Sequence, residues 1–313
     1  MKIVIGYDGS DYADSALDHL SRAGLPRRAD ALVISVAGRS LSEPPPSSYE
    51  LVEAMQKVGP DSDSQSGVGK DALLAEAEAL ALSLQASKRL KSIFPDWDVR
   101  AAAESHPTSP AWVLMQRADE WGADLIVVGS QGRSMLGRMI LGSVSRKVAT
   151  DAKCSVLVGR CRDEERGEKN GSTARIIIGL DGSESSDQVI RAVAARTWHG
   201  GSLARLVTAL VIAPGLIVEQ QTERAEEFHH GAKALLRSAG LEVSSLIKIN
   251  EPEHLLLEEA ETWQADCIFV GARGLGRMGR FLLGSVSTAV VTDAKCSVEI
   301  VRVRQPNEAV DSL

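Results

Sequence analysis

The sequence predicts an α/β fold made of two tandem open parallel five-stranded sheets, each with strand order 3-2-1-4-5 and helices on both faces. Three observations support this fold class. The chain repeats itself, short apolar runs alternate with longer amphipathic stretches, and each half carries a glycine-rich loop after its fourth apolar run. Short strands that alternate with longer helices are typical of parallel sheets with crossover connections.

The internal repeat is clearest near the end of each half. Residues 142–156 read GSVSRKVATDAKCSV and residues 284–298 read GSVSTAVVTDAKCSV, which are identical at twelve of fifteen positions. The start of each half repeats as well, because IVIGYDGS at 3–10 corresponds to IIIGLDGS at 176–183. A chain of 313 residues also has the length of two ordinary domains. We therefore expect two copies of one fold.

The domain boundaries follow from local composition. Residues 39–70 are rich in Pro and Ser, show neither strand nor helix periodicity and have no counterpart in the second half, which predicts a flexible surface insertion. The charged, Gly-bearing run at 161–173 lies between the repeats and predicts a linker. We expect the first domain at 1–160, the second at 174–304 and a tail at 305–313.

The predicted strands are five apolar runs in each half, and the amphipathic stretches between them predict the helices. In the first half the strands span residues 2–7, 31–37, 97–103, 124–129 and 155–160. In the second half they span residues 175–180, 203–212, 242–249, 266–271 and 297–303.

Composition and charge exclude several classes of protein. Apolar residues make up 44% of the chain and charged residues 25%, which is ordinary for a soluble globular protein. The net charge of −7 argues against a sequence-independent grip on nucleic acid, which depends on Lys and Arg neutralising phosphates. No apolar run reaches about 18 residues and the first residues do not resemble a signal peptide, so we expect a cytoplasmic protein without a membrane partner.

Cys, His and paired Glu residues give no pattern of a metal or catalytic site. The four cysteines form no C-x-x-C pair and have no His at metal spacing, so we expect reduced, mostly buried thiols. His229 and His230 lie in a charged amphipathic run and are expected on the solvated surface. The carboxylate pairs Glu226–Glu227 and Glu258–Glu259 are expected on helix exteriors, away from any two-carboxylate chemistry.

The glycine loops carry the strongest functional signal. After the fourth predicted strand, each half has the same spacing G-x-x-G-(nine)-G-S, which begins at Gly129 in the first half and at Gly271 in the second. Glycine lets the backbone approach a ligand without an intervening Cβ, so that amide N–H groups can converge on an anion. The helix predicted after the loop adds unpaired N–H groups and its positive dipole end. The pattern therefore predicts a phosphate site in each half.

An acidic residue follows the first predicted strand of each half, Asp8 in one and Asp181 in the other. In a sheet of order 3-2-1-4-5, strands one and four are neighbours at the point where the strand order reverses, so each Asp should face its glycine loop. D-G-S before a helix is equally the sequence of a plain turn and N-cap, and both interpretations stay open. Neither G-x-G-x-x-G after the first strand nor G-x-x-x-x-G-K-[ST] occurs, so neither a dehydrogenase nor a P-loop ATPase is indicated.

The strand-borne Asp, the G-x-x-G-(nine)-G-S loop and the S-V-S helix start together resemble the universal stress protein family in its ATP-binding branch, over nearly the whole of both halves. The resemblance implies an adenine-nucleotide hydrolase-like fold that binds ATP with Mg²⁺. It also implies pairing through the last strands, so the two halves are expected to form an intramolecular pseudo-dimer, with a homodimer as an alternative, and to act on an unidentified protein partner.

The resemblance implies the following binding residues at the matching positions. Adenine and ribose would lie on Asp8, Val36 and Val128, and the phosphates on Gly129, Gly132, Gly142, Ser143, Val144 and Ser145. The second half would use Asp181, Leu210, Val270, Gly271, Gly274, Gly284, Ser285, Val286 and Ser287. Hydroxyls of the four serines are expected to bind the phosphates.

The leading expectation is a nucleotide-dependent regulatory module of the stress response. A slow adenine-nucleotide hydrolase of the same fold is the alternative, since no general base besides Asp8 and Asp181 is evident. A nucleotide-free scaffold would have broken glycine loops, and these are intact. The second loop carries three arginines, Arg273, Arg277 and Arg280, whereas the first loop carries two, Arg133 and Arg138. The second site is therefore expected to bind phosphate more tightly.

Overall fold

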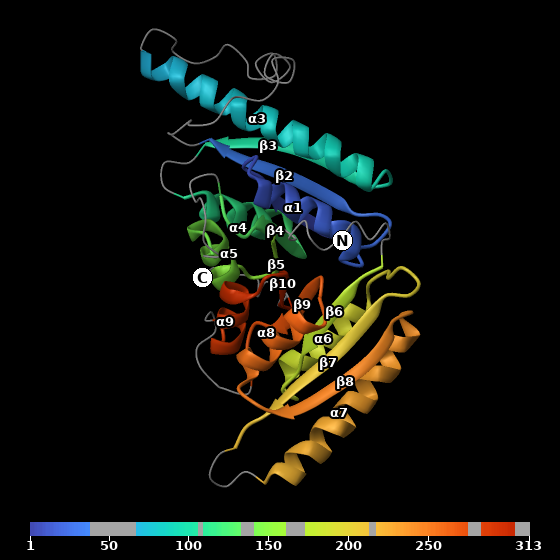
Figure 1. Cartoon of the computed structure of the whole chain (residues 1–313). Helices are drawn as coiled ribbons and strands as arrows, with labels where there is room; N and C mark the ends of the chain where they lie inside the picture. The colour runs from blue at the N-terminus through green and yellow to red at the C-terminus, as the bar shows by residue number, and fades with distance from the viewer. Residues whose placement is uncertain are drawn as a thin grey trace, which may run out of the picture.

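The computed structural model describes residues 1–37, 67–105, 109–132, 141–160, 173–212, 217–274 and 283–303 (Figure 1). The first half contains β1 (Lys2–Gly6), α1 (Asp11–His19), the 3₁₀ turn η1 (Leu20–Arg22), β2 (Asp30–Ala37), α3 (Gly67–Ile93), β3 (Asp98–Ser105), α4 (Pro110–Trp121), β4 (Leu125–Gly129), α5 (Ser143–Asp151) and β5 (Ser155–Gly159). The second half contains β6 (Arg175–Gly179), α6 (Glu184–Ala194), β7 (Leu203–Leu210), α7 (Val218–Ser238), β8 (Glu242–Ile249), α8 (Pro252–Thr262), β9 (Cys267–Gly271), α9 (Ser285–Asp293) and β10 (Ser297–Val301).

All ten strands form one sheet in the order β3-β2-β1-β4-β5-β10-β9-β6-β7-β8. Within each half the strands are parallel and follow the predicted order 3-2-1-4-5. The prediction of two separate sheets is wrong, because β5 and β10 pair antiparallel, with Leu157 opposite Glu299. An edge strand leaves a row of unpaired N–H and C=O groups, and this pairing satisfies one such row from each half.

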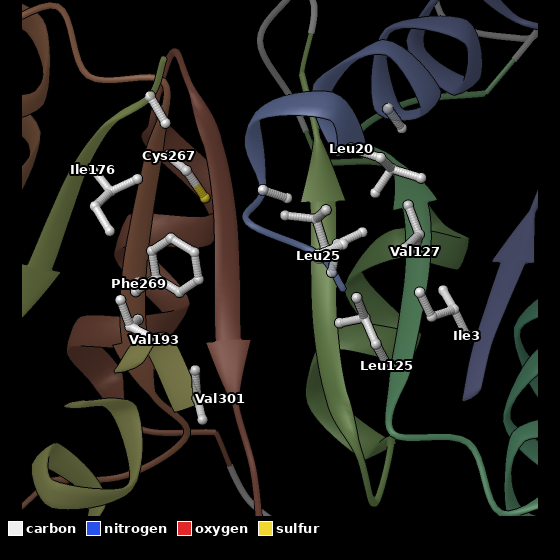
Figure 2. Close-up of a cluster of buried hydrophobic side chains, with 14 of the residues drawn as sticks. Ile3, Leu20, Leu25, Leu125, Val127, Ile176, Val193, Cys267, Phe269 and Val301 are labelled. Atoms are coloured by element: carbon white, nitrogen blue, oxygen red, sulfur yellow. The ribbon is translucent and has the colours of Figure 1, made fainter. Parts of the chain in front are cut away.

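The hydrophobic core continues across the junction between the halves. One buried cluster covers one face of the sheet under α1, α3, α6 and α7, and a second covers the other face under α4, α5, α8 and α9. Figure 2 shows part of the first cluster, with Leu125 and Val127 of β4 on one side of the view and Cys267 and Phe269 of β9 on the other. Both halves therefore contribute apolar residues to each of the two clusters.

Two predictions about helices need correction. The expected insertion at 39–70 ends earlier, because α3 already begins at Gly67; residues 39–66 lie outside the described part of the chain. His229 was expected on the surface, yet it is 1% exposed, whereas His230 is exposed. The buried face of α7 repeats at helical spacing through Ala225, His229, Ala232 and Leu236, so position along the helix decides the burial of His229.

The remaining sequence expectations can be compared with the described residues. Cys154, Cys267 and Cys296 are free and buried, and Cys161 lies outside the described part of the chain. Among the described helices, none is long and apolar enough to cross a membrane. The segments 161–172 and 304–313, which contain most of the predicted linker and the predicted tail, also lie outside it.

Candidate functional site

The candidate site of each half lies where the strand order reverses. β1 pairs with β2 on one side and with β4 on the other, and β6 pairs in the same way with β7 and β9. The chains leaving β1 and β4 therefore run to opposite faces of the sheet, which opens a crevice at the carboxyl ends of these strands. Asp8 and Gly129 stand at this crevice in the first half, and Asp181 and Gly271 in the second.

The turn after β1 uses one oxygen of Asp8. Its Oδ1 accepts hydrogen bonds from the Ser10 amide (3.1 Å) and the Ser10 hydroxyl (2.6 Å). Gly9 takes φ +76° between them, and Ser10 caps α1 by accepting from the Ala13 amide. Asp8 Oδ1 thus stabilises the turn and Ser10 is the N-cap, as one of the two interpretations of D-G-S predicted.

The other carboxylate oxygen of Asp8 faces the glycine loop. A Cβ placed on Gly132 would lie 2.8 Å from Asp8 Oδ2, so a side chain at this position would displace a carboxylate that Ser10 holds through Oδ1. The second half repeats the arrangement, with a Gly274 Cβ 2.4 Å from Asp181 Oδ2. Asp181 Oδ1 accepts from the Ser183 amide and the Ser186 hydroxyl. The expectation that each Asp faces its loop is confirmed geometrically.

The first glycine of each loop has a packing reason. A Cβ on Gly129 would lie 2.8 Å from the backbone carbon of Tyr12 in α1, and one on Gly271 would overlap the Ser185 side chain in α6. Both positions therefore need glycine for helix packing, whether or not a ligand binds. Gly132 and Gly274 are the positions at which the missing side chain leaves room beside the carboxylate.

The N-termini of α5 and α9 present free amides. Gly142 caps α5 with extended backbone, and its own amide donates to Ser130 O at 2.8 Å. The Ser143 and Val144 amides belong to the first turn of α5, where an amide has no acceptor within the helix. Among the described residues, no other acceptor for these two amides is found. In the second half the Gly284 amide donates to Ala272 O, again at 2.8 Å, and leaves the Ser285 and Val286 amides in the same state.

The serine hydroxyls divide into two groups. Ser143 and Ser285 are exposed at the helix starts. Ser145 is buried and its hydroxyl donates to Gly129 O at 2.5 Å, while that of Ser287 donates to Gly271 O at 2.6 Å. The expectation that all four hydroxyls serve phosphate is therefore not met in this structure, because two of them fasten the helix to the end of the fourth strand.

Strand register corrects one proposed correspondence. Gly6 lies opposite Ile34, and its counterpart Gly179 lies opposite Val207. Counting from these pairs, the residue that matches Val36 is Ala209, and Leu210 matches Ala37. Val128 and Val270 are both buried in the fourth strands directly before the loop glycines.

Two hydroxyl residues near the site were not identified by the sequence analysis. Ser35 of β2 donates to Tyr7 O at 2.7 Å, and Thr208 of β7 donates to Leu180 O at 2.8 Å. Each bond fixes the carbonyl immediately before the site Asp. The signal was present, since both second strands carry a hydroxyl residue at the same register position.

The expected difference in arginine content falls mostly outside the described residues. Arg273 is exposed directly before Gly274, and Gln131, its counterpart, is buried. Arg133, Arg138, Arg277 and Arg280 lie outside the described part of the chain.

A cavity of about 430 Å³ lies between the halves, away from both glycine loops. Arg22 and Asp266 in its wall pair at 3.8 Å, and Lys295 pairs with Glu261 at 2.9 Å. The cavity lining contains no part of a glycine loop and no start of α5 or α9, so it does not resemble the duplicated sites. Among the described residues, no cluster of His, Cys, Asp and Glu could hold a metal ion.

Comparison with known proteins decides the family. The sequence profile of the universal stress protein family matches residues 1–160 and 173–302. The chain belongs to the universal stress protein family.

A relative of similar length shares both halves of this universal stress protein, and a second relative matches over a shorter stretch. A universal stress protein of Mycobacterium tuberculosis is 24% identical over 317 aligned positions, which cover 96% of each chain. One from Mycolicibacterium smegmatis is 31% identical over 189 positions, which cover 58% of this chain and 63% of the relative. The crystal structure of a universal stress protein from Archaeoglobus fulgidus matches with a TM-score of 0.59 and 19% identity, covering 96% of this chain and 98% of the other. The last likeness supports the fold.

Proposed function

We propose that this universal stress protein binds one ATP, with Mg²⁺, in each half and acts as a nucleotide-dependent regulatory module of the stress response. One observation carries the proposal. Both halves bring together a carboxylate oxygen, a glycine that leaves room beside it, and a helix start with free amides, all at the strand-order reversal.

The residues fit a triphosphate at one end of the site. The Ser143 and Val144 amides and the Ser143 hydroxyl lie at the positive end of α5, where phosphate oxygens are favoured. Ser285 and Val286 take these roles at α9. Asp8 and Asp181 would accept hydrogen bonds from ribose hydroxyls through Oδ2, which lies on the side of the glycine loop. Mg²⁺ would neutralise part of the phosphate charge when the nucleotide is bound.

Hydrolysis of ATP is the weaker proposal. Each site Asp is anchored through Oδ1 to its turn, so the carboxylate is held in place and is poorly suited to follow an attacking water. We expect ATP to be held rather than turned over.

The two halves are proposed to act as an intramolecular pseudo-dimer. The β5–β10 pairing and the shared apolar clusters join them in one chain, as an interface would join two subunits. A single chain would then carry both nucleotide sites in a fixed relation.

Titration calorimetry with Mg-ATP tests the proposal on the full chain. We expect two sites per chain in the parent, one in Gly132→Val, one in Gly274→Val and none in the double variant, because the valine fills the space beside the site carboxylate. Gly200→Val is the matched control, since a Cβ there meets no atom within 4 Å. Absence of binding by a folded parent chain, or full binding by the double variant, would overturn the proposal.

A further inference from the structure

Two arginines cross from one half to the other directly after the last strands. Arg160 follows β5 and donates from Nη2 to Val291 O (2.5 Å) and Thr292 O (2.9 Å) at the end of α9. Arg302 follows β10 and donates from Nη2 to carbonyls at the end of α5. These bonds are 2.5 Å long to Ala149 O and 3.3 Å to Thr150 O.

The carbonyls that these arginines hold have no donor within their own helices. The Ala294 amide closes α9 on Val290 O, which leaves the later carbonyls of that helix without a helical partner. The Ala152 amide closes α5 on Val148 O in the same way. A guanidinium at a helix C-terminus both donates to these carbonyls and meets the negative end of the helix dipole.

Arg160 is buried, Arg302 is partly buried, and both are charged. Arg160 is 8% exposed, and within the described residues no carboxylate lies within ion-pair distance of it. Burial lowers the pKa of Arg160, and it lowers the pKa of Arg302 to about 10. Arginine side chains stay protonated in proteins at neutral pH. Their positive charge is therefore directed mainly at the helix ends of the opposite half.

The contacts are reciprocal. The Arg160 amide donates to the Ser297 hydroxyl at the start of β10 (3.3 Å), and the Arg302 amide donates to the Ser155 hydroxyl at the start of β5 (3.1 Å). The helices α5 and α9 also pack against each other beside the β5–β10 junction (Figure 1). The same set of bonds thus runs in both directions between the halves.

The residue before each arginine accepts a hydrogen bond from the glycine loop of the same half. The amide of Ser130, which follows β4, donates to Gly159 O at 2.8 Å, next to Arg160. The amide of Ala272 donates to Val301 O at 3.2 Å, next to Arg302. The start of one glycine loop is therefore connected, through a strand end and an arginine, to the far end of the other half's loop-following helix.

We propose that Arg160 and Arg302 are positioning residues that couple the two nucleotide sites, each holding the phosphate-binding helix of the opposite half. This inference rests on the proposed function, since it assigns the N-termini of α5 and α9 to phosphate. Occupancy at one loop shifts the strand end and arginine behind it, and so changes the affinity of the other site. By linkage the effect is mutual.

Site-selective binding tests the positioning by the two arginines on which the coupling depends. Gly132→Val leaves the second site alone in the chain, and Gly274→Val leaves the first. Adding Arg160→Gln should weaken Mg-ATP binding at the second site by about 5-fold or more, within the usual range of coupling between sites, and should leave the first site nearly unchanged. Arg302→Gln should do the reverse, so the two arginines are matched controls for each other. Arg160→Lys, which keeps the charge and an N–H donor but not the planar guanidinium, should restore part of the lost affinity.

The crossed pattern separates positioning from general destabilisation. Equal weakening of both sites, or weakening of the site in the arginine's own half, would overturn the coupling while leaving the proposed function intact. If the parent chain binds no ATP, the proposed function fails and the coupling fails with it. Hydrogen exchange without nucleotide provides the second measurement: Arg160→Gln should speed exchange in residues 285–293 more than in 143–151, and unchanged exchange in 285–293 would also overturn the inference.

Discussion

The buried His229 makes stability depend on pH in the acid range. Its Nε2 lies 2.8 Å from Thr208 Oγ1, and its Nδ1 is hydrogen-bonded to the Ser245 hydroxyl. The Thr208 hydroxyl donates to Leu180 O, so it accepts from Nε2–H, and Nδ1 is left to accept from Ser245. This is the arrangement of the neutral imidazole, which burial favours. Burial, followed by the nearby Lys233, lowers the pKa of His229 to about 4.

The sign and size of the effect follow from the difference in pKa. An unfolded histidine has a pKa of about 6.5, so between that value and about 4 the unfolded state binds more protons than the folded state. The stabilisation is present above pH 6.5 and is lost as the pH falls. Linkage gives a loss of about 2 kcal/mol in unfolding free energy between pH 7 and pH 5 from this one residue.

Urea denaturation of the parent, His229→Gln and His230→Gln at pH 7 and pH 5 measures this contribution. Gln retains hydrogen-bonding capacity but does not titrate, so His229→Gln should lose about 2 kcal/mol less than the parent over this range. His230 is exposed in the next position of α7, and its replacement should leave the pH dependence unchanged. A parent and a His229→Gln variant with the same pH dependence would refute the reasoning.

Three further predictions concern the interface, the loops and the insertion. Arg196→Ala leaves Glu299, which is 1% exposed, as an unpaired buried carboxylate, so urea denaturation should show a loss of about 3–5 kcal/mol in unfolding free energy. An equal loss in Arg117→Ala, which removes an exposed ion pair, would contradict this. Calorimetry should show tighter and more salt-sensitive ATP binding in Gly132→Val than in Gly274→Val, because the second loop has more arginines; equal affinities would contradict this. Deleting 40–66 should preserve the melting temperature and ATP stoichiometry, since the second half has no such segment; an insoluble product would show that the segment is structural.

The strand order within each half could be predicted because it depends on local patterns. Apolar runs, helical periodicity and D-G-S turns recur in both halves, and the handedness of crossover connections restricts how they assemble. The joining of β5 to β10 could not be predicted from local patterns, and only the family resemblance implied pairing through the last strands. The joining depends on which two sheet edges meet in space, and the sequence of neither strand specifies the strand with which it pairs.

The candidate site shows the same division. The proximity of Asp8 to Gly132 followed from topology alone, and the structure confirms it. The packing of Gly129 against the backbone of α1 could not be predicted, because the sequence does not place that backbone. The one-residue error at Leu210 arose because pairing register fixes the counterpart of Val36, and register is a tertiary property.

The nucleotide content of the purified full-length chain tests the central claim most directly. Acid release followed by chromatography should yield adenine nucleotide, and equilibrium dialysis against Mg-ATP should fill the chain to two nucleotides. The double variant Gly132→Val with Gly274→Val, purified and treated in the same way, should contain and take up none. A folded parent chain that releases no nucleotide and takes up none on dialysis would contradict the assignment of the two glycine loops as ATP sites.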